Sequence, residues 1–293
     1  MNLLRSNGIT KKIIDAVFSK STPKNLGKNQ SNQGTFKMPS NYGRGHVKLR
    51  QSDVFLTSYP KSGNTWTRFL IANLIKPDCL ISFANINDIV PDIYKTPSQQ
   101  LNELPNTRII KSHECFDPRY KKVIYLVRNP YSVSVSFYHH LIKFNKISEE
   151  TEFRDFLQNF LQGLYMKNMG SWEKNVASWL DNKSHDKEQF LLIKYEDLRL
   201  NPFQETKKIQ SFLSLDIEDK KVKEAIELSD FKHMQNLEKN QNNEAFFAST
   251  NSQKNFVRSA DLDEWKRYFD KQSTDLVKVK FGKVMERLGY STT

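Results

Sequence analysis

A cation, several hydroxyl groups and one glycine gather in the stretch YPKSGNTW, residues 59–66. An apolar run at 53–57 precedes it and a segment with helical periodicity follows, so a strand is expected to turn into a helix here. The first N–H groups of a helix lack partners within it and carry the positive end of its dipole, so they can bind phosphate. These N–H groups belong to Gly63, Asn64, Thr65 and Trp66. With the charge of Lys61 and the hydroxyls of Ser62 and Thr65, they predict a phosphate-binding loop.

The spacing of this loop differs from that of the common nucleotide-binding motif. GxxxxGK[ST], in which the lysine enters the helix, occurs nowhere in the chain, and Lys61 precedes the turn instead. An ordinary nucleoside triphosphatase is therefore disfavoured. A P-loop-type nucleotide kinase would share the core fold and remains an alternative, although it should carry that lysine and acids that hold magnesium.

Strand-like and helix-like segments alternate from residue 53 onward. The strand-like segments are VFLTS (54–58), RIIKS (108–112), KKVIYLV (121–127) and FLLIKY (190–195). The apolar faces of two following helices are formed by Trp66, Phe69, Leu70 and Leu74, and by Val133, Phe137, Leu141 and Phe144. Such alternation predicts an α/β fold, a single domain with a central parallel sheet flanked by helices. Ligands of such sheets bind at the carboxyl ends of the strands, where the phosphate-binding loop would lie.

Composition limits the class of protein. Of the 293 residues, 38% are hydrophobic and 12% aromatic, which excludes a disordered chain, and no run approaches the roughly eighteen apolar residues of a membrane span. Cys79 and Cys115 are the only cysteines and form no CxxC pair, so neither a disulfide framework nor a structural zinc site is indicated. The first residues lack the pattern of a secretory signal. The sequence therefore predicts a soluble, cytoplasmic protein.

The formal net charge of +12 creates a field that attracts phosphate. The lysines alternate with acids through 205–288, however, which is typical of solvated helix faces. No binding of nucleic acid is therefore expected, and it is the phosphate-binding motif that favours a small polyanion as ligand.

Residues 1–46 are expected to form an N-terminal arm and linker. One short amphipathic helix is predicted by the spacing of Ile9, Ile13, Ile14, Val17 and Phe18. A stretch rich in Asn, Gly, Ser and Pro follows it and is typical of a linker. The domain that carries the site is therefore expected at 47–293.

YPKSGNTW resembles the 5′-phosphosulfate loop of the sulfotransferases that use 3′-phosphoadenosine-5′-phosphosulfate (PAPS), commonly YPKSGTTW, with Asn64 where many members have threonine. A second segment, RNPYSVSVSFY at 128–138, is similar to the family's 3′-phosphate segment, RNPxDxxVSxY. Between them, the segment IKSH at 110–113 matches the family's strand-end lysine and catalytic histidine. The resemblance covers roughly residues 47–290, in matching order.

The resemblance implies transfer of a sulfonate group from PAPS to a hydroxyl or an amine of a small molecule, with no metal required. It implies catalytic roles for Lys61, Lys111 and His113. The nucleotide contacts that it implies are Lys61, Ser62, Gly63, Asn64, Thr65 and Trp66 in the loop, Arg128 and Ser136 at the 3′-phosphate, and Tyr195, Ser229 and Phe231 at the adenine.

One family segment, FxRKG…W, is matched less well. Phe256 and Arg258 fit it, but Ser259 replaces the lysine and Ala260 replaces the glycine. Arg258, with Ser259 and Ala260 beside it, is still expected to contact the 3′-phosphate. Alanine restricts positive φ angles and the close approach of a backbone to phosphate. We therefore expect a lower affinity for the nucleotide than is usual in the family.

The residue types suit this reaction. Lys61 offers a point charge to the leaving phosphate oxygen, and Lys111 can neutralise the sulfonyl oxygens. Histidine is the natural base at neutral pH, and His113 is expected to take the proton of the acceptor. His139 and His140, on the helix after the 3′-phosphate segment, are expected either to pack in the fold or to contact the acceptor. A catalytically silent nucleotide-binding protein would lose the base, so the two lysines and His113 argue against it.

The acceptor is expected to lie against the segments 82–104, 139–150 and 240–256, whose mixture of aromatic and polar residues selects no acceptor class.

Many cytosolic relatives form dimers through a segment resembling KxxxTVxxxE. Here Asp270 and Lys271 stand where that pattern has an uncharged pair. Charges are unfavourable at the centre of a small interface, so this dimer is not expected.

Overall fold

The computed structural model describes residues 47–166, 169–183, 186–240, 257–259 and 261–291. The predicted arm at 1–46 lies outside the described residues, as do nearly all of the predicted acceptor segment 240–256 and Ala260.

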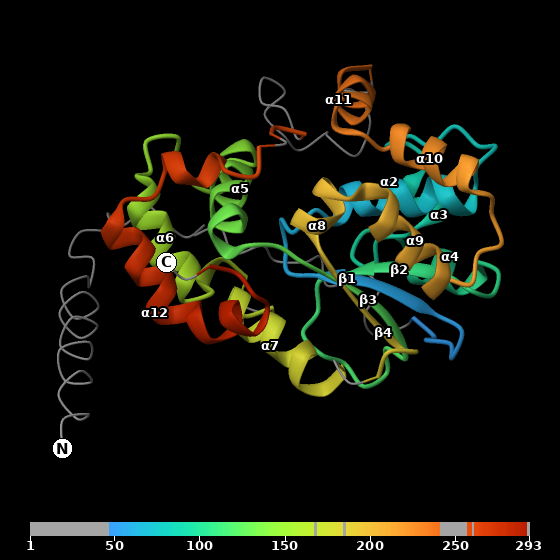
Figure 1. The fold of residues 1–293 in the computed structure, drawn as a ribbon, viewed down its shortest axis with the longest axis horizontal. Helices are drawn as coiled ribbons and strands as arrows, with labels where there is room; N and C mark the ends of the chain where they lie inside the picture. The colour runs from blue at the N-terminus through green and yellow to red at the C-terminus, as the bar shows by residue number, and fades with distance from the viewer. Residues whose placement is uncertain (1–46, 167–168, 184–185, 241–256, 260, 292–293) are drawn as a thin grey trace. The chain divides into compact units, whose positions relative to one another are not determined.

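In the described part of the chain, four parallel strands form one sheet, in the order β2–β1–β3–β4 (Figure 1). Their bounds are β1 (Val54–Ser58), β2 (Ile109–Ser112), β3 (Lys122–Val127) and β4 (Phe190–Lys194). Val54 lies opposite Ile109 on one side and Lys122 on the other. Nearly continuous apolar runs suit strands that are buried on both faces, and the predicted strands are confirmed. Because the strands are parallel, all of their carboxyl ends lie at one edge of the sheet.

Helices follow or separate the strands. Their bounds are α2 (Asn64–Ile75), α3 (Ile86–Ile89), α4 (Ser98–Glu103), α5 (Pro130–Lys143), α6 (Phe153–Leu161), η1 (Leu164–Met166), α7 (Trp172–Lys183), α8 (Tyr195–Leu200), α9 (Pro202–Phe212), α10 (Asp219–Glu227), α11 (Phe231–Asn240), η2 (Glu264–Arg267) and α12 (Lys271–Arg287). The two predicted apolar helices correspond to α2 and α5. Tyr195, which the sequence placed at the end of a strand, begins α8 instead. Within the described ranges, no helix is long and apolar enough to cross a membrane.

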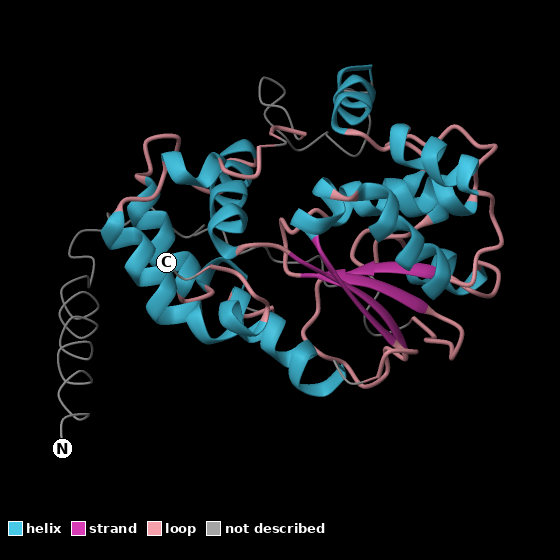
Figure 2. Ribbon diagram, viewed as in Figure 1, coloured by secondary structure: helices cyan, strands magenta, loops and turns pink. Residues whose placement is uncertain are grey.

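Two apolar cores cover the two faces of the sheet. The helices that pack there are drawn in cyan beside the magenta strands in Figure 2. Alternate strand residues face opposite sides, so Phe55 packs in the core with α5, α6, α7 and α12, whereas Leu56 packs in the core with α2, α3, α9 and α10. This three-layer arrangement confirms the predicted α/β fold.

A buried ion pair closes the edge of the sheet opposite the carboxyl ends. The guanidinium of Arg108, just before β2, donates to both carboxylate oxygens of Asp53, just before β1, over 2.8 and 2.5 Å. Arg108 also donates to the backbone carbonyls of Leu101 and Lys48. The amino ends of the two strands are thus fixed by contacts that the sequence motifs did not indicate.

Candidate functional site

The loop between β1 and α2 has the predicted position and an unusual backbone. Lys61 and Gly63 both have positive φ angles, of 70° and 94°. A Cβ atom on Gly63 would lie 2.4 Å from Cδ2 of Tyr195, so only glycine fits against that ring. The loop therefore turns sharply into α2, and Tyr195, the first residue of α8, packs against Gly63.

Several buried polar atoms around the loop have no hydrogen-bond partner among the described residues. The donors among them are Oγ of Ser62, Nε1 of Trp66 and Nε of Arg128, and one acceptor, Oδ1 of Asn64, is also unpaired. Buried donors left without partners are costly, and most in folded proteins are satisfied by protein, water or ligand. A hydroxyl, an indole N–H and a guanidinium N–H around one helix N-terminus fit an anionic nucleotide.

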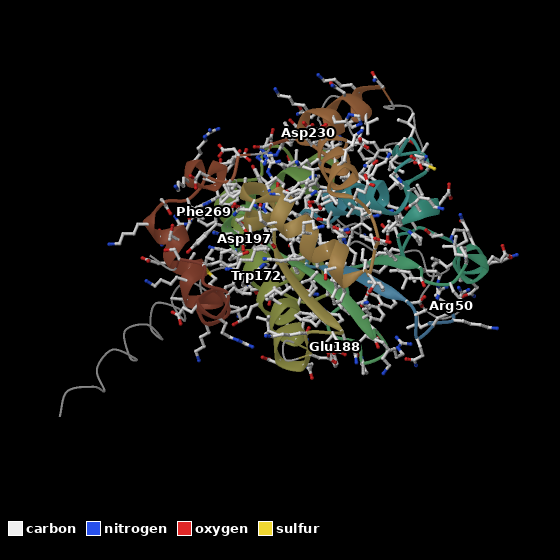
Figure 3. All side chains as sticks on the ribbon, turned by 45° about the vertical axis from the view of Figure 1, so that its right-hand side comes forward. Arg50, Trp172, Glu188, Asp197, Asp230 and Phe269 are labelled. Carbon is white, nitrogen blue, oxygen red and sulfur yellow. The ribbon has the colours of Figure 1, made fainter. Side chains whose placement is uncertain are left out.

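Arg128, which is predicted to contact the 3′-phosphate, lies beside this loop. Its guanidinium stacks 4.3 Å from the ring centre of Tyr195, and its Nη1 donates to the backbone carbonyl of Lys61 over 3.4 Å. The indole of Trp172, labelled in Figure 3, donates to the backbone carbonyl of Arg128 over 3.2 Å. The strand end, the loop and α8 are thereby joined around one cation.

The ammonium group of Lys61 lies in a strongly cationic environment. Burial, followed by the charges of Arg128 and Arg258, lowers the pKa of Lys61 to about 7. Its Nζ is 3.4 Å from Nδ1 of His140, whose pKa burial and the charge of Lys61 hold well below its usual range. A neutral His140 can accept a hydrogen bond from this ammonium. The site is therefore built for a ligand with several negative charges.

His113 follows β2 and is held by the end of β1. Its Nδ1 is 2.8 Å from the backbone carbonyl of Ser58, which can only accept, so Nδ1 carries the proton and Nε2 keeps its lone pair. Burial, followed by the charge of Lys111, lowers the pKa of His113 to about 3, against the hydrogen bond to Ser58. The imidazole is thus neutral at physiological pH, as a general base must be.

Lys111 points into a buried polar cluster. Its Nζ donates to Oδ2 of Asp92 over 2.9 Å and lies 5.0 Å from the ring centre of Tyr94. Burial lowers the pKa of Lys111 to about 8, although the charge of Asp92 raises it. Asp92 pairs with Lys111 as an isolated parallel bridge at the edge of the sheet. Sequence reasoning missed Asp92 because no motif surrounds it.

The predicted adenine contacts differ in burial. Trp66 packs edge-to-face on Tyr195, with ring centres 5.6 Å apart, and Phe231 begins α11 half-buried. Ser229 is fully buried, and its hydroxyl donates to the backbone carbonyl of Ala225 and accepts from Asn73. The hydroxyl of Ser229 is therefore engaged within the fold.

Arg258 is held by an acid on the same segment. Both of its Nη groups donate to the carboxylate of Glu264, in an ion pair that includes a 2.8 Å contact to Oε2. The charge of Arg258 also lowers the pKa of Lys61, which is consistent with its predicted place near the phosphates. Ser259, the next residue, and Ser136, on α5, are both half-buried.

The two adjacent histidines of α5 have different partners. Nε2 of His139 is 2.7 Å from the hydroxyl of Tyr268, whereas His140 faces Lys61. His140 is therefore a site residue that the sequence left undecided. A pattern of helical spacing from the Arg128 segment could have indicated which of the two histidines turns inward.

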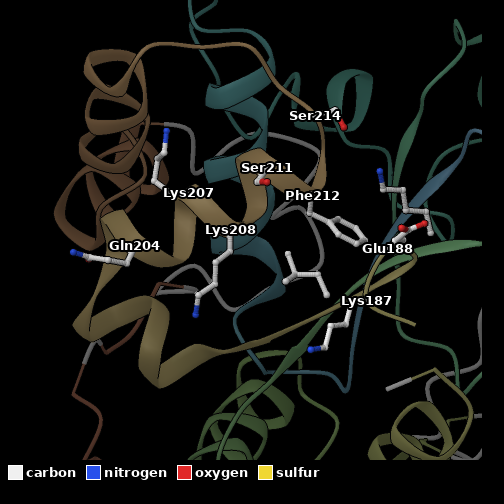
Figure 4. Close-up of a pocket in the computed structure, with 10 residues that line it drawn as sticks. Lys187, Glu188, Gln204, Lys207, Lys208, Ser211, Phe212 and Ser214 are labelled. Carbon is white, nitrogen blue, oxygen red and sulfur yellow. The ribbon is translucent and has the colours of Figure 1, made fainter. Parts of the chain in front are cut away.

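A surface hollow among the described residues lies elsewhere (Figure 4). It measures about 670 Å³ and includes Lys122, the first residue of β3, so it lies near the amino ends of the strands. It contains none of the predicted site residues. Among the described residues, no three His, Cys, Asp or Glu side chains gather as metal ligands would.

Comparison with known proteins agrees with this geometry. The family described as "Sulfotransferase domain" matches residues 51–289. Sulfotransferase 1B1 of Canis lupus familiaris is 27% identical over 253 residues, which cover 80% of this chain and 84% of that protein. Flavonol 3-sulfotransferase of Flaveria bidentis is 28% identical over 266 residues, 83% of each chain.

A solved structure supports the same relationship. The mouse sulfotransferase SULT7A1 complexed with PAP superposes with a TM-score of 0.66 and 26% sequence identity, over 83% of this chain and 90% of that one. The chain therefore belongs to the sulfotransferase family, which confirms the predicted enzyme, a PAPS-dependent sulfotransferase.

Proposed function

We propose that PAPS binds with its 5′-phosphosulfate on the loop at 59–66 and its 3′-phosphate between Arg128, Ser136 and Arg258. The unpaired donors of Ser62 and Arg128 and the lowered pKa of Lys61 support this orientation. The mouse relative is complexed with adenosine 3′,5′-bisphosphate (PAP), which supports the choice of PAPS as the nucleotide.

The proposed reaction is an in-line transfer. The acceptor oxygen attacks the sulfur, the bond from sulfur to the 5′-phosphate oxygen breaks, and PAP leaves with the bonding electrons. Nε2 of His113 takes the acceptor proton, while Lys61 stabilises the charge that develops on the departing phosphate. Lys111, oriented by Asp92, is proposed to neutralise the sulfonyl oxygens.

A single observation carries the assignment of the base. The hydrogen bond from Nδ1 of His113 to the carbonyl of Ser58 leaves a lone pair on Nε2, one residue past the end of β2. Parallel sheets deliver side chains to a ligand crevice at such a position. The negative charge of the donor would raise the low pKa of His113 and make the imidazole a stronger base.

The acceptor is proposed to be a small molecule with a hydroxyl or an amine. The names of the relatives include a flavonol and an amine sulfotransferase, which supports this class. We also propose that the enzyme is cytoplasmic and needs no metal. The nucleotide kinase is not favoured, because the matched family transfers sulfonate.

Labelled PAPS and a panel of phenols, alcohols and amines test this function. His113→Ala should bind PAP as the wild type does, because its side chain contacts the acceptor side. Its turnover should fall by about 10²-fold or more, the usual scale for losing a general base. A variant with near wild-type turnover would contradict the role of His113.

A further inference from the structure

Asn64 stands where many members of the family have threonine, and its side chain turns away from the phosphate-binding surface. The side chain is buried, and its Nδ2 donates to Oγ of Ser58 over 3.1 Å and to the backbone carbonyl of Leu56 over 3.4 Å. These contacts tie the first turn of α2 to the last residues of β1. Only the backbone N–H of Asn64 remains for the phosphate.

Ser58 links this amide to the catalytic histidine. Its carbonyl is 2.8 Å from Nδ1 of His113, and its Oγ is 3.4 Å from the same nitrogen. Ser58 is fully buried, so no water competes for these contacts. Asn64 and His113 thus both bond to Ser58, Asn64 at its hydroxyl and His113 at its backbone carbonyl.

The position of Ser58 decides which nitrogen of His113 is basic. While Nδ1 donates to the carbonyl, Nε2 keeps the lone pair that takes the acceptor proton. If Ser58 shifts, the imidazole of His113 can turn or carry its proton on Nε2. Molecules in which this happens have no base for the acceptor proton. A polar partner that fixes a tautomer in this way can change turnover without touching the substrate.

We propose that Asn64 is a positioning residue, which holds Ser58 so that His113 presents an unprotonated Nε2 to the acceptor. This inference rests on the proposed role of His113 as the base. It assigns to the side chain of Asn64 a function in catalysis and none in donor binding.

Asn64→Ala tests the proposal, and Gln210→Ala is its matched control. Gln210 is also a buried amide, donates to the backbone carbonyls of Leu215 and Ile217, and has an unpaired Oε1, as Asn64 has an unpaired Oδ1. It lies on α9, outside the site. Each variant removes two hydrogen bonds to the fold, so the two should lose similar stability.

Only Asn64→Ala should affect the chemistry. We expect its kcat to fall by about 10-fold, which is less than the fall of about 10²-fold expected when the base itself is removed. The Kd of PAP should change by less than about two-fold. Asn64→Thr keeps one hydroxyl donor and should recover part of the turnover. It also serves if Asn64→Ala does not fold.

Nitrogen-15 spectra of the histidine rings, with the signals of His113 assigned by their loss in His113→Ala, report the tautomer directly. The wild type and Gln210→Ala should show Nδ1 protonated, and Asn64→Ala should show a mixture. This readout does not depend on catalysis, so it separates failure of the inference from failure of the proposed base. An unchanged tautomer in Asn64→Ala, or a fall in PAP affinity that matches the fall in kcat, would overturn the inference.

Discussion

The ammonium of Lys61 couples donor binding to pH. In the free protein, burial and neighbouring cations lower the pKa of Lys61 to about 7. Anionic phosphates beside the ammonium would raise this pKa. At pH 8 both phosphates of PAP are already ionised, since their second pKa is about 6. We therefore predict that the protein takes up a proton when PAP binds at pH 8, and that affinity falls as pH rises above 7.

Calorimetry in buffers with different ionisation enthalpies measures this proton uptake. Lys61→Arg is the control, because arginine keeps the charge and does not titrate in this range. The variant should take up less than the wild type, with any remainder assigned to Lys111, whose pKa is about 8. Equal uptake by both proteins, or release of protons, would show that Lys61 is already charged in the free protein.

Sequence motifs predicted the residues of the candidate site, but not the residues that contact them. Lys61, His113 and Arg128 belong to short segments with fixed spacing, so their types were readable directly. Asp92 and His140 reach the site only through the packing of loops and the rotation of α5. Ser229 was expected at the adenine, but a motif cannot indicate whether a serine hydroxyl faces a cleft or a helix carbonyl.

At the scale of elements, the turn from β1 into α2 depends on one glycine. Gly63 has a φ of 94°, and any Cβ there would overlap the ring of Tyr195. Gly63→Ala should lower the free energy of unfolding by about 1–3 kcal/mol, the usual cost of such strain, and should weaken PAP binding more than His113→Ala does. Denaturant unfolding and calorimetry measure the two effects.

Gly282→Ala provides the comparison for Gly63→Ala. Gly282 lies within α12, and the nearest atom to its added Cβ would be 3.9 Å away on Lys278. Alanine favours a helix over glycine by about 1 kcal/mol, so this variant should be neutral or more stable and should bind PAP normally. A Gly63→Ala protein that behaves in the same way would contradict the role of the turn.

The strands were predictable because each is a short apolar run between polar segments, buried on both faces. Their order in the sheet was not readable from the runs, because β3 lies beside β1 and not beside β2, the strand that precedes it in the sequence. The sequence placed Tyr195 in a strand, whereas the structure places it in a helix, and its residue type alone could not decide between them. An aromatic residue suits either element, and the acidic first turn of α8 decides between them.

At the scale of the whole molecule, we predict that the chain does not form a dimer through residues 266–275. Asp270 accepts a hydrogen bond from the N–H of Ser273 at the start of α12, and both Asp270 and Lys271 are exposed. Pairing this segment across a two-fold axis would bury like charges. Light scattering gives the mass in solution, and cross-linking at Lys266 and Lys271 should yield no link between copies. A link there would contradict the prediction.

The central claim is that two phosphate sites converge on one nucleotide, and the melting temperature with different nucleotides tests it most directly. PAP fills both sites, so it should raise the melting temperature far more than ADP or ATP with magnesium. Arg128→Ala should remove most of this preference, because the 3′-phosphate loses a charged hydrogen-bond partner. The loss in binding free energy should be about 2 kcal/mol. Equal stabilisation of the wild type by PAP and by ATP with magnesium would contradict the claim.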